Sequence, residues 1–119
     1  MSILMRRGEI RLVDFDPTRG AEANKVRPAI IVSNDAANST AARLGRGVVT
    51  VVPVTSNIER IHPFQVLLPV DSTGLPASSK AQAEQVRSIA VERVGARVGS
   101  VSQPLMNELN EALRLHLGL

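Results

Sequence analysis

The sequence predicts a mainly β protein, in which a small and strongly bent sheet or partial barrel is followed by one C-terminal helix. Short runs of β-branched residues recur between turn signals before residue 102, a pattern typical of small sheets and barrels. From Ser102 onward, the spacing of apolar residues changes from the period of a strand to that of a helix. A chain of 119 residues supports a single core, so we expect one domain over 1–119.

Four strands are predicted in the first part of the chain. Residues 9–15 (EIRLVDF) alternate between two faces. The runs at 28–33 (PAIIVS) and 47–54 (GVVTVVPV) are rich in valine and isoleucine, which is typical of strands buried on both faces. A fourth strand, 64–68 (FQVLL), is bounded on each side by a proline.

The segment after the fourth strand is harder to divide by periodicity alone. Residues 71–79 (DSTGLPASS) contain glycine and proline and are predicted to form turns. Short strands are then expected near 80–83 and 86–89, followed by a helical turn around 91–94 and another short strand near 97–101.

Two helices are predicted, each with a recognisable cap. A short helix over 34–45 begins with Asn34 or Asp35 as its N-cap. The terminal helix begins with Ser102 or Gln103 as its cap, and a proline lies in its first turn, where the missing N–H is tolerated. One face of the terminal helix is apolar. That face comprises Leu105, Met106, Leu109, Ala112, Leu113 and Leu117.

The charge of the chain is positive and is carried mostly by arginine. The formal net charge is +3, and 12 of the 14 basic residues are arginine. Residues 1–60 hold nine basic and six acidic groups, while 61–119 hold five of each, so the excess lies in the first half. Because a guanidinium binds phosphate with two donors and stacks on bases, this bias points to an anionic partner. A genome that favours arginine codons would produce the same bias.

Several classes of function find no support in the sequence. The chain has no cysteine, which removes disulfides, thiolate zinc sites and cysteine nucleophiles. Its two histidines, His62 and His116, have no partner at metal-ligand spacing, and no serine-nucleophile or phosphate-loop motif is present, so we expect no metal and no cofactor. No apolar run approaches a membrane span and the first residues lack a signal sequence, so a cytoplasmic location is expected.

Arg27 is the most informative candidate for a functional residue. Pro28 restricts the backbone before it to an extended form, which holds the arginine at the mouth of a strand. Such a site suits a phosphate. A structural salt bridge to Glu22, Asp14 or Asp16 would explain the same pattern.

Two further polar clusters have alternative interpretations. Asp14 and Asp16 could hold Mg²⁺, or they could accept hydrogen bonds from loop N–H groups in Asx turns. Thr55, Ser56 and Asn57 follow the strand 47–54. Because the strands of a small barrel end at a shared rim, Thr55 could face the arginine across it, although a simple turn at the strand end accounts for the same residues.

Taken together, these segments resemble the MazF/PemK family of toxin ribonucleases. The similarity runs through RRGEIRLVDFDPTRGAEANKVRPAIIVSND, VVPVTSN, HPFQVLLP, AEQVRSIAVERV and the terminal helix. The resemblance implies an SH3-like barrel of the PemK/CcdB type and a homodimer that takes up single-stranded RNA. It also implies metal-independent cleavage at a short sequence, which leaves 2′,3′-cyclic phosphate and 5′-hydroxyl ends, and a cognate MazE-like antitoxin.

The resemblance also implies roles for particular residues. The family's catalytic arginine falls on Arg27 and its catalytic threonine on Thr55. Its loop glutamate falls on Glu22, with Asp16 and Ser56 as possible supporting residues. Further residues are expected to contact RNA. These are Phe15, Thr18, Arg19, Lys25, Asn57 and Gln85.

Two other functions are compatible with the same fold. A CcdB-like gyrase poison relies on a tryptophan near its C-terminus, and this chain contains none. A non-catalytic RNA-binding barrel would not need both Arg27 and Thr55. Within the ribonuclease hypothesis the proton acceptor stays open among Glu22, Asp16, His62, the substrate and water, because arginine is effectively always protonated.

Overall fold

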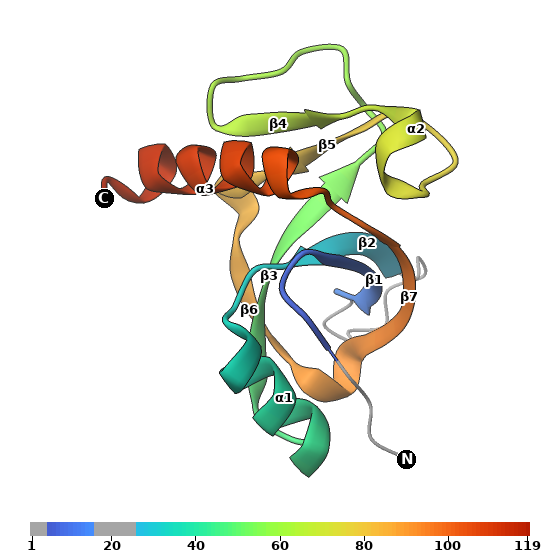
Figure 1. The fold of residues 1–119 in the computed structure, drawn as a ribbon, viewed down its shortest axis with the longest axis vertical. Coiled ribbons are helices and arrows are strands. Elements are labelled where there is room, and N and C mark those ends of the chain that lie inside the picture. The colour runs from blue at the N-terminus through green and yellow to red at the C-terminus, as the bar shows by residue number, and fades with distance from the viewer. Residues whose placement is uncertain (1–4, 16–25) are drawn as a thin grey trace.

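The computed structural model, which describes residues 5–15 and 26–119, is a bent antiparallel sheet flanked by helices (Figure 1). The strands follow the order β4-β5-β3-β2-β1-β7, and β6 pairs separately with β3. The predicted mainly β fold with a terminal helix is therefore confirmed. The strands are β1 (Glu9–Asp14), β2 (Val26–Ile31), β3 (Val48–Thr55), β4 (Gln65–Leu68), β5 (Ser79–Gln82), β6 (Arg87–Ala90) and β7 (Val94–Ser100).

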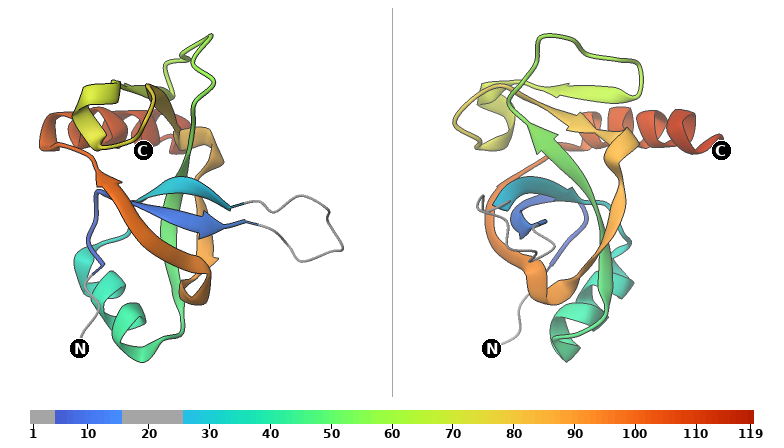
Figure 2. Two further views of the ribbon diagram at one scale, coloured as in Figure 1. Left: turned by 90° about the vertical axis from the view of Figure 1, so that its right-hand side faces the viewer. Right: turned by 180° about the vertical axis from the view of Figure 1, so that it is seen from behind.

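The helices lie at opposite ends of the curved sheet, as the two further views in Figure 2 show. Both main helices begin at a predicted cap: the side chain of Asn34 accepts a hydrogen bond from Ala37 N, and that of Ser102 accepts one from Leu105 N. Among the described residues, no helix is both long and apolar enough to span a bilayer. The helices are α1 (Asp35–Leu44), α2 (Val70–Thr73) and α3 (Gln103–Leu117), with 3₁₀ turns η1 (Ala83–Gln85) and η2 (Val91–Arg93).

Two strand boundaries differ from the prediction in a way that matters for the site. β2 begins at Val26, before the predicted start at residue 28, because Val26 and Arg27 already pair with Asp14 and Val13 of β1. β3 continues through Thr55, which pairs with β5. Arg27 and Thr55 therefore lie within strands, whereas the sequence pattern placed them just outside.

The later part of the chain is close to the prediction, with two corrections. β5, β6 and η2 each lie within one residue of their expected bounds. β7 begins at Val94 rather than near residue 97, because it pairs with β1 across two register shifts that periodicity does not reveal. The segment 71–79, expected to contain only turns, overlaps the one-turn helix α2, which Gly74 closes with a φ of +93°.

β3 pairs with strands on both of its edges. β2 lies along one edge, with Ala29 opposite Pro53. The other edge is shared by two strands: Val48–Val51 pair with β6, whereas Val54 and Thr55 pair with β5. The turn η1 connects these two partners, so the chain bends at the point where β3 changes its neighbour.

The apolar residues of the central strands divide into two core clusters, one on each face of the sheet. In β2, Ile30 contributes to the first cluster and Ile31 to the second, and both side chains are fully buried. Helix α3 covers the first cluster, and Ala41 of α1 joins the second. This arrangement confirms the expected burial of β2 and β3 on both faces. Met106, Leu109 and Ala112 are the buried residues of α3.

Gly99 of β7 approaches the carbonyl group of Thr73 so closely that a side chain would not fit. A Cβ atom at residue 99 would lie 2.3 Å from Thr73 O. We expect Gly99→Ala to lower the free energy of unfolding by about 1–3 kcal/mol, because backbone must move to relieve the overlap. Urea denaturation measures this change, and Ser100→Ala, at the exposed neighbouring position, is the control. Equal stability of the two variants would contradict the tight contact.

Candidate functional site

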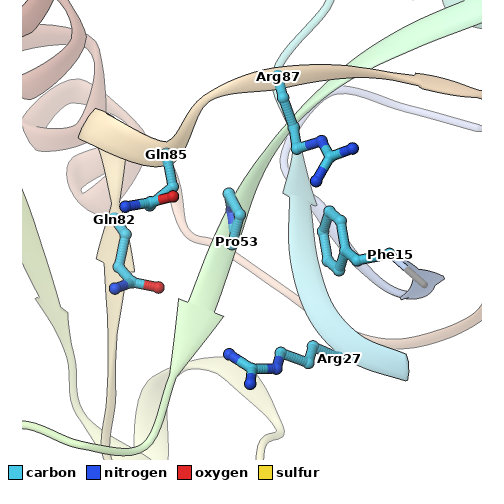
Figure 3. Close-up of a pocket in the computed structure, with 6 residues that line it drawn as sticks. All are labelled: Phe15, Arg27, Pro53, Gln82, Gln85 and Arg87. Atoms are coloured by element: carbon cyan, nitrogen blue, oxygen red, sulfur yellow. The ribbon is translucent and has the colours of Figure 1, made fainter. Parts of the chain in front are cut away.

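A pocket of about 390 Å³ opens beside β3, on the face of the sheet that carries the second core cluster. Its described walls come from the residue after β1, from β2 and β3, and from the stretch between the end of β5 and the start of β6. Figure 3 shows that the side chains point from these elements toward one shared space. The described residues that line it are Phe15, Arg27, Pro53, Gln82, Gln85 and Arg87.

Arg27 reaches this pocket from β2, as the loop–Arg–Pro pattern suggested. Its side chain is exposed, and within the described residues it forms no ion pair. Of the three carboxylates considered as salt-bridge partners, that of Asp14 lies 4.0 Å from Arg93 instead. The other two, Asp16 and Glu22, lie outside the described residues. A guanidinium that faces an open pocket is available to bind an anion.

Arg87 brings a second guanidinium to the pocket, from β6. Its guanidinium carbon lies 5.2 Å from the centroid of the Phe15 ring, which is a cation–π contact (Figure 3). Phe15 is half-buried against the second core cluster, so the ring provides a firm support for the arginine. The sequence pattern alone does not single out Arg87, although it lies two residues after Gln85 in AEQVRS.

Two glutamine amides face the arginines across the pocket. Gln82 ends β5 and Gln85 ends η1, so the bend between β5 and β6 brings both side chains to the same wall (Figure 3). Gln85 was expected to lie near the substrate groove, and Gln82 joins it only because of this bend. Amide groups offer both donors and acceptors, which suits contacts to base edges or to sugar hydroxyls.

Thr55 shares a face of the sheet with Arg27. Ala29 lies opposite Pro53, and side chains two residues apart on a strand point to the same side. The described pairing ends at Ala29 and Pro53. Arg27 and Thr55 each lie two residues beyond that pair, so the same register places them opposite each other on one face of the sheet. Thr55 is half-buried and does not belong to the described lining of the pocket.

The hydroxyl group of Thr55 has a defined orientation. Thr55 Oγ1 accepts a hydrogen bond of 3.2 Å from Asn57 N, and Asn57 Oδ1 accepts one of 3.3 Å from Glu59 N. Since the threonine oxygen is already accepting, its proton is left to donate to another group. Ser56 and Asn57 are exposed and, like Thr55, lie outside the described lining. These hydrogen bonds fit the turn interpretation of the cluster, while a role for Thr55 in the site stays a prediction.

Several expected site residues cannot be placed. Asp16, Thr18, Arg19, Glu22 and Lys25 lie outside the described residues. Within the described part of the chain, no three histidine, aspartate or glutamate side chains lie close enough together to hold a metal ion. A second pocket of about 180 Å³ adjoins the first, since Phe15 and Arg87 line both, and its lining also includes Arg93 and the carboxylate Asp14. The described site is therefore rich in guanidinium and amide groups.

The contact between Phe15 and Arg87 can be measured by a double-mutant cycle. Phe15→Leu removes the aromatic face with a small change in volume, and Arg87→Met removes the cation but keeps a long side chain. We expect a coupling of about 0.5–1 kcal/mol in the free energy of unfolding, the range for cation–π pairs at exposed sites. Additive effects of the two substitutions would show that the ring does not hold the arginine.

Comparison with known proteins identifies the family. Residues 6–117 match the family described as PemK-like, MazF-like toxin of type II toxin–antitoxin system. The chain is 63% identical over 116 residues to the endoribonuclease MazF9 of Mycobacterium tuberculosis, with 98% of each chain covered. A MazE–MazF structure from Deinococcus radiodurans is similar with a TM-score of 0.78 and 25% identity, with 99% of each chain covered.

An endoribonuclease in complex with its cognate antitoxin, from a mycobacterial species, is similar with a TM-score of 0.75. Its sequence is 25% identical, over 97% of this chain and 96% of that one. The similarity of sequence and fold thus extends over nearly the whole chain. The chain belongs to the PemK/MazF family of toxins from type II toxin–antitoxin systems.

Proposed function

We propose that this chain is a sequence-specific endoribonuclease toxin that cleaves single-stranded RNA, messenger RNA among it, and so inhibits translation and growth. Membership of the family and the similarity to the endoribonuclease MazF9 over 98% of the chain support this activity. A MazE-like antitoxin neutralises the toxin, in keeping with the similar complexes from Deinococcus radiodurans and a mycobacterial species. The chain acts as one domain over 1–119 and as a homodimer.

The observation that carries the mechanism is the pair of guanidinium groups at one pocket. Arg27 and Arg87 come from different strands, and the described lining contains no carboxylate to neutralise them. The phosphodiester of RNA carries one negative charge, and that charge increases as the phosphorus becomes pentavalent. Two cations at this point stabilise the transition state more than the ground state, which is the requirement for catalysis.

The reaction uses a nucleophile that the substrate provides. The 2′-oxygen forms a bond to the adjacent phosphorus while the bond from phosphorus to the 5′-oxygen of the next nucleotide breaks. The products are a 2′,3′-cyclic phosphate and a 5′-hydroxyl, and no metal takes part. DNA is not cleaved, because it lacks the 2′-hydroxyl.

Thr55 donates a hydrogen bond from its hydroxyl group to a phosphate oxygen in this proposal. The hydrogen bond that Asn57 N gives to Thr55 Oγ1 fixes the hydroxyl group and leaves its proton free for that purpose. Ser56, the neighbouring exposed residue, has a supporting role.

Proton transfer requires a group other than the arginines, which do not lose their protons near neutral pH. Asp16, Glu22, His62, the substrate itself or water takes the proton of the 2′-hydroxyl, and the same group or a water molecule gives a proton to the 5′-oxygen as it leaves. Contacts that select the RNA sequence come from Phe15 and Gln85 in the pocket and from the two neighbouring loops. The loop residues with this role are Thr18, Arg19, Lys25 and Asn57.

The first test is incubation of the purified protein with a long single-stranded RNA in EDTA, followed by sequencing of the fragments and analysis of their ends. We expect cleavage at one short sequence with cyclic phosphate ends. Arg27→Ala should lower kcat by about 10²–10³-fold, as the loss of one such donor does in other enzymes. Arg114→Met, which removes an exposed cation from α3, is the control for charge. Absence of cleavage, or equal rates for wild type and Arg27→Ala, would refute the mechanism.

The role of Thr55 is tested by two substitutions that differ in one group. Thr55→Val keeps the shape of the side chain but removes the hydroxyl, and we expect kcat to fall about 10²-fold. Thr55→Ser keeps the hydroxyl and should retain most of the activity. Single-turnover rates at saturating RNA give this comparison directly. If serine and valine are equally impaired, the hydroxyl is not the important group.

A further inference from the structure

Lys80 is a buried lysine in the middle strand of the β3–β5–β4 ladder, and the mechanism above does not use it. Lys80 is only 9% exposed. Its Nζ donates a hydrogen bond of 2.7 Å to the carbonyl oxygen of Arg60. Within the described residues Lys80 forms no ion pair. Burial of an ammonium group without a carboxylate is unfavourable for stability, so its position calls for another explanation.

The register of the ladder places Lys80 on the same face as Thr55. Lys80 lies opposite Thr55 on one side and opposite Leu67 on the other. Its neighbour Ala81 points the other way, into the first core cluster. Gln82, two residues along the strand, returns to the face of Lys80 and lines the pocket. The ammonium group is therefore buried on the side of the sheet that carries the site, beneath the loop that contains Arg60.

This β3–β4 loop (residues 56–64) is also fixed at its other end. Gln65 is 8% exposed, and its Oε1 accepts a hydrogen bond of 3.0 Å from His62 N. Its Nε2 donates one of 2.8 Å to Glu84 Oε2, in the turn η1. Because η1 follows Gln82 and ends with Gln85, the amide of Gln65 joins the loop to the wall of the pocket that these two glutamines form.

We infer that Lys80 is a positioning residue that fixes the β3–β4 loop next to the RNA site, and so governs discrimination between RNA sequences. The inference rests on the proposed function. Lys80 and Gln65 hold the loop through backbone groups, so its side chains project from a fixed frame. The backbone of Thr55 pairs with that of Lys80 in β5, and a change in the lysine side chain leaves this pairing in place. The bond from Asn57 N to Thr55 Oγ1 lies next to the strand end, before the contact at Arg60. Release of the loop should therefore affect the choice of sequence more than the chemical step.

The test compares wild type with Lys80→Met, which keeps the length of the side chain but removes the donor and the charge. On a pool of random single-stranded RNA, we expect the ratio of kcat/KM between the preferred and the second-best sequence to fall roughly tenfold, because a loosely held loop no longer fixes its contacts to RNA. Single-turnover kcat at the preferred sequence should change less than threefold. The melting temperature should be unchanged or higher, since a buried charge has been removed.

Two measurements separate positioning from other roles. Amide hydrogen exchange of residues 56–64 should become faster in Lys80→Met. This measurement does not depend on RNA cleavage. The salt dependence of KM should match that of wild type, because the ammonium group faces Arg60 O and not a phosphate. Arg27→Ala should instead reduce this dependence. Arg114→Met is the matched control for a lost cation.

Gln65→Met removes the hydrogen bonds of Gln65 to His62 N and Glu84 Oε2. It should change the discrimination between RNA sequences and the amide exchange of the loop in the same direction as Lys80→Met, and it tests the inference if Lys80→Met does not fold. A lower melting temperature with unchanged discrimination would assign Lys80 a merely structural role and overturn the inference. Unchanged exchange in the loop would overturn it as well. If wild type cleaves no RNA but the loop loosens in Lys80→Met, the proposed function fails while the positioning role of Lys80 stands.

Discussion

The structure depends on the pairing of β3, because this strand is hydrogen-bonded on both edges and buried on both faces. Val51 and Val52, neighbours in β3, are fully buried in different clusters. A strand with this environment cannot slip by one residue without moving every side chain to the wrong face. The register of β2, β5 and β6 against β3 is therefore fixed, and with it the relative positions of the side chains that those strands bring to the pocket.

The pocket follows from a discontinuity in that ladder. Along one edge of β3 the hydrogen-bonded partner changes from β6 to β5. The chain between these two strands bends through η1, and the bend leaves a space that a continuous strand would fill. Guanidinium groups enter this space from two strands and amides from the bend. The gathering of guanidinium and amide groups in the pocket thus arises from topology and sequence together, since strands that are far apart in the chain bring these residues to one place.

Much of the fold could be predicted from the sequence because its signals are local. The valine-rich runs gave the buried strands, and Asn34 and Ser102 marked the helix starts because a cap bonds to a backbone group three residues away. The early start of β2 could not be predicted, since Arg27 is held there by Val13 of another strand. The same applies to the site: Arg27 and Thr55 have characteristic neighbours in the sequence, whereas Arg87 depends on a ring 72 residues away. Lys80 gave no sequence signal at all.

The separation between strand-borne and loop-borne groups has a consequence for how such a protein diverges over time. Arg27 and Thr55 are held by strand pairing. The exposed segment 56–59 lies before Arg60, the residue whose carbonyl group accepts the hydrogen bond from Lys80. Substitutions in that segment leave the sheet intact and leave Arg27 and Thr55 in their strand positions. Under the proposed function, new RNA targets would thus arise from point changes at a few exposed positions, while the groups held by the strands keep their places.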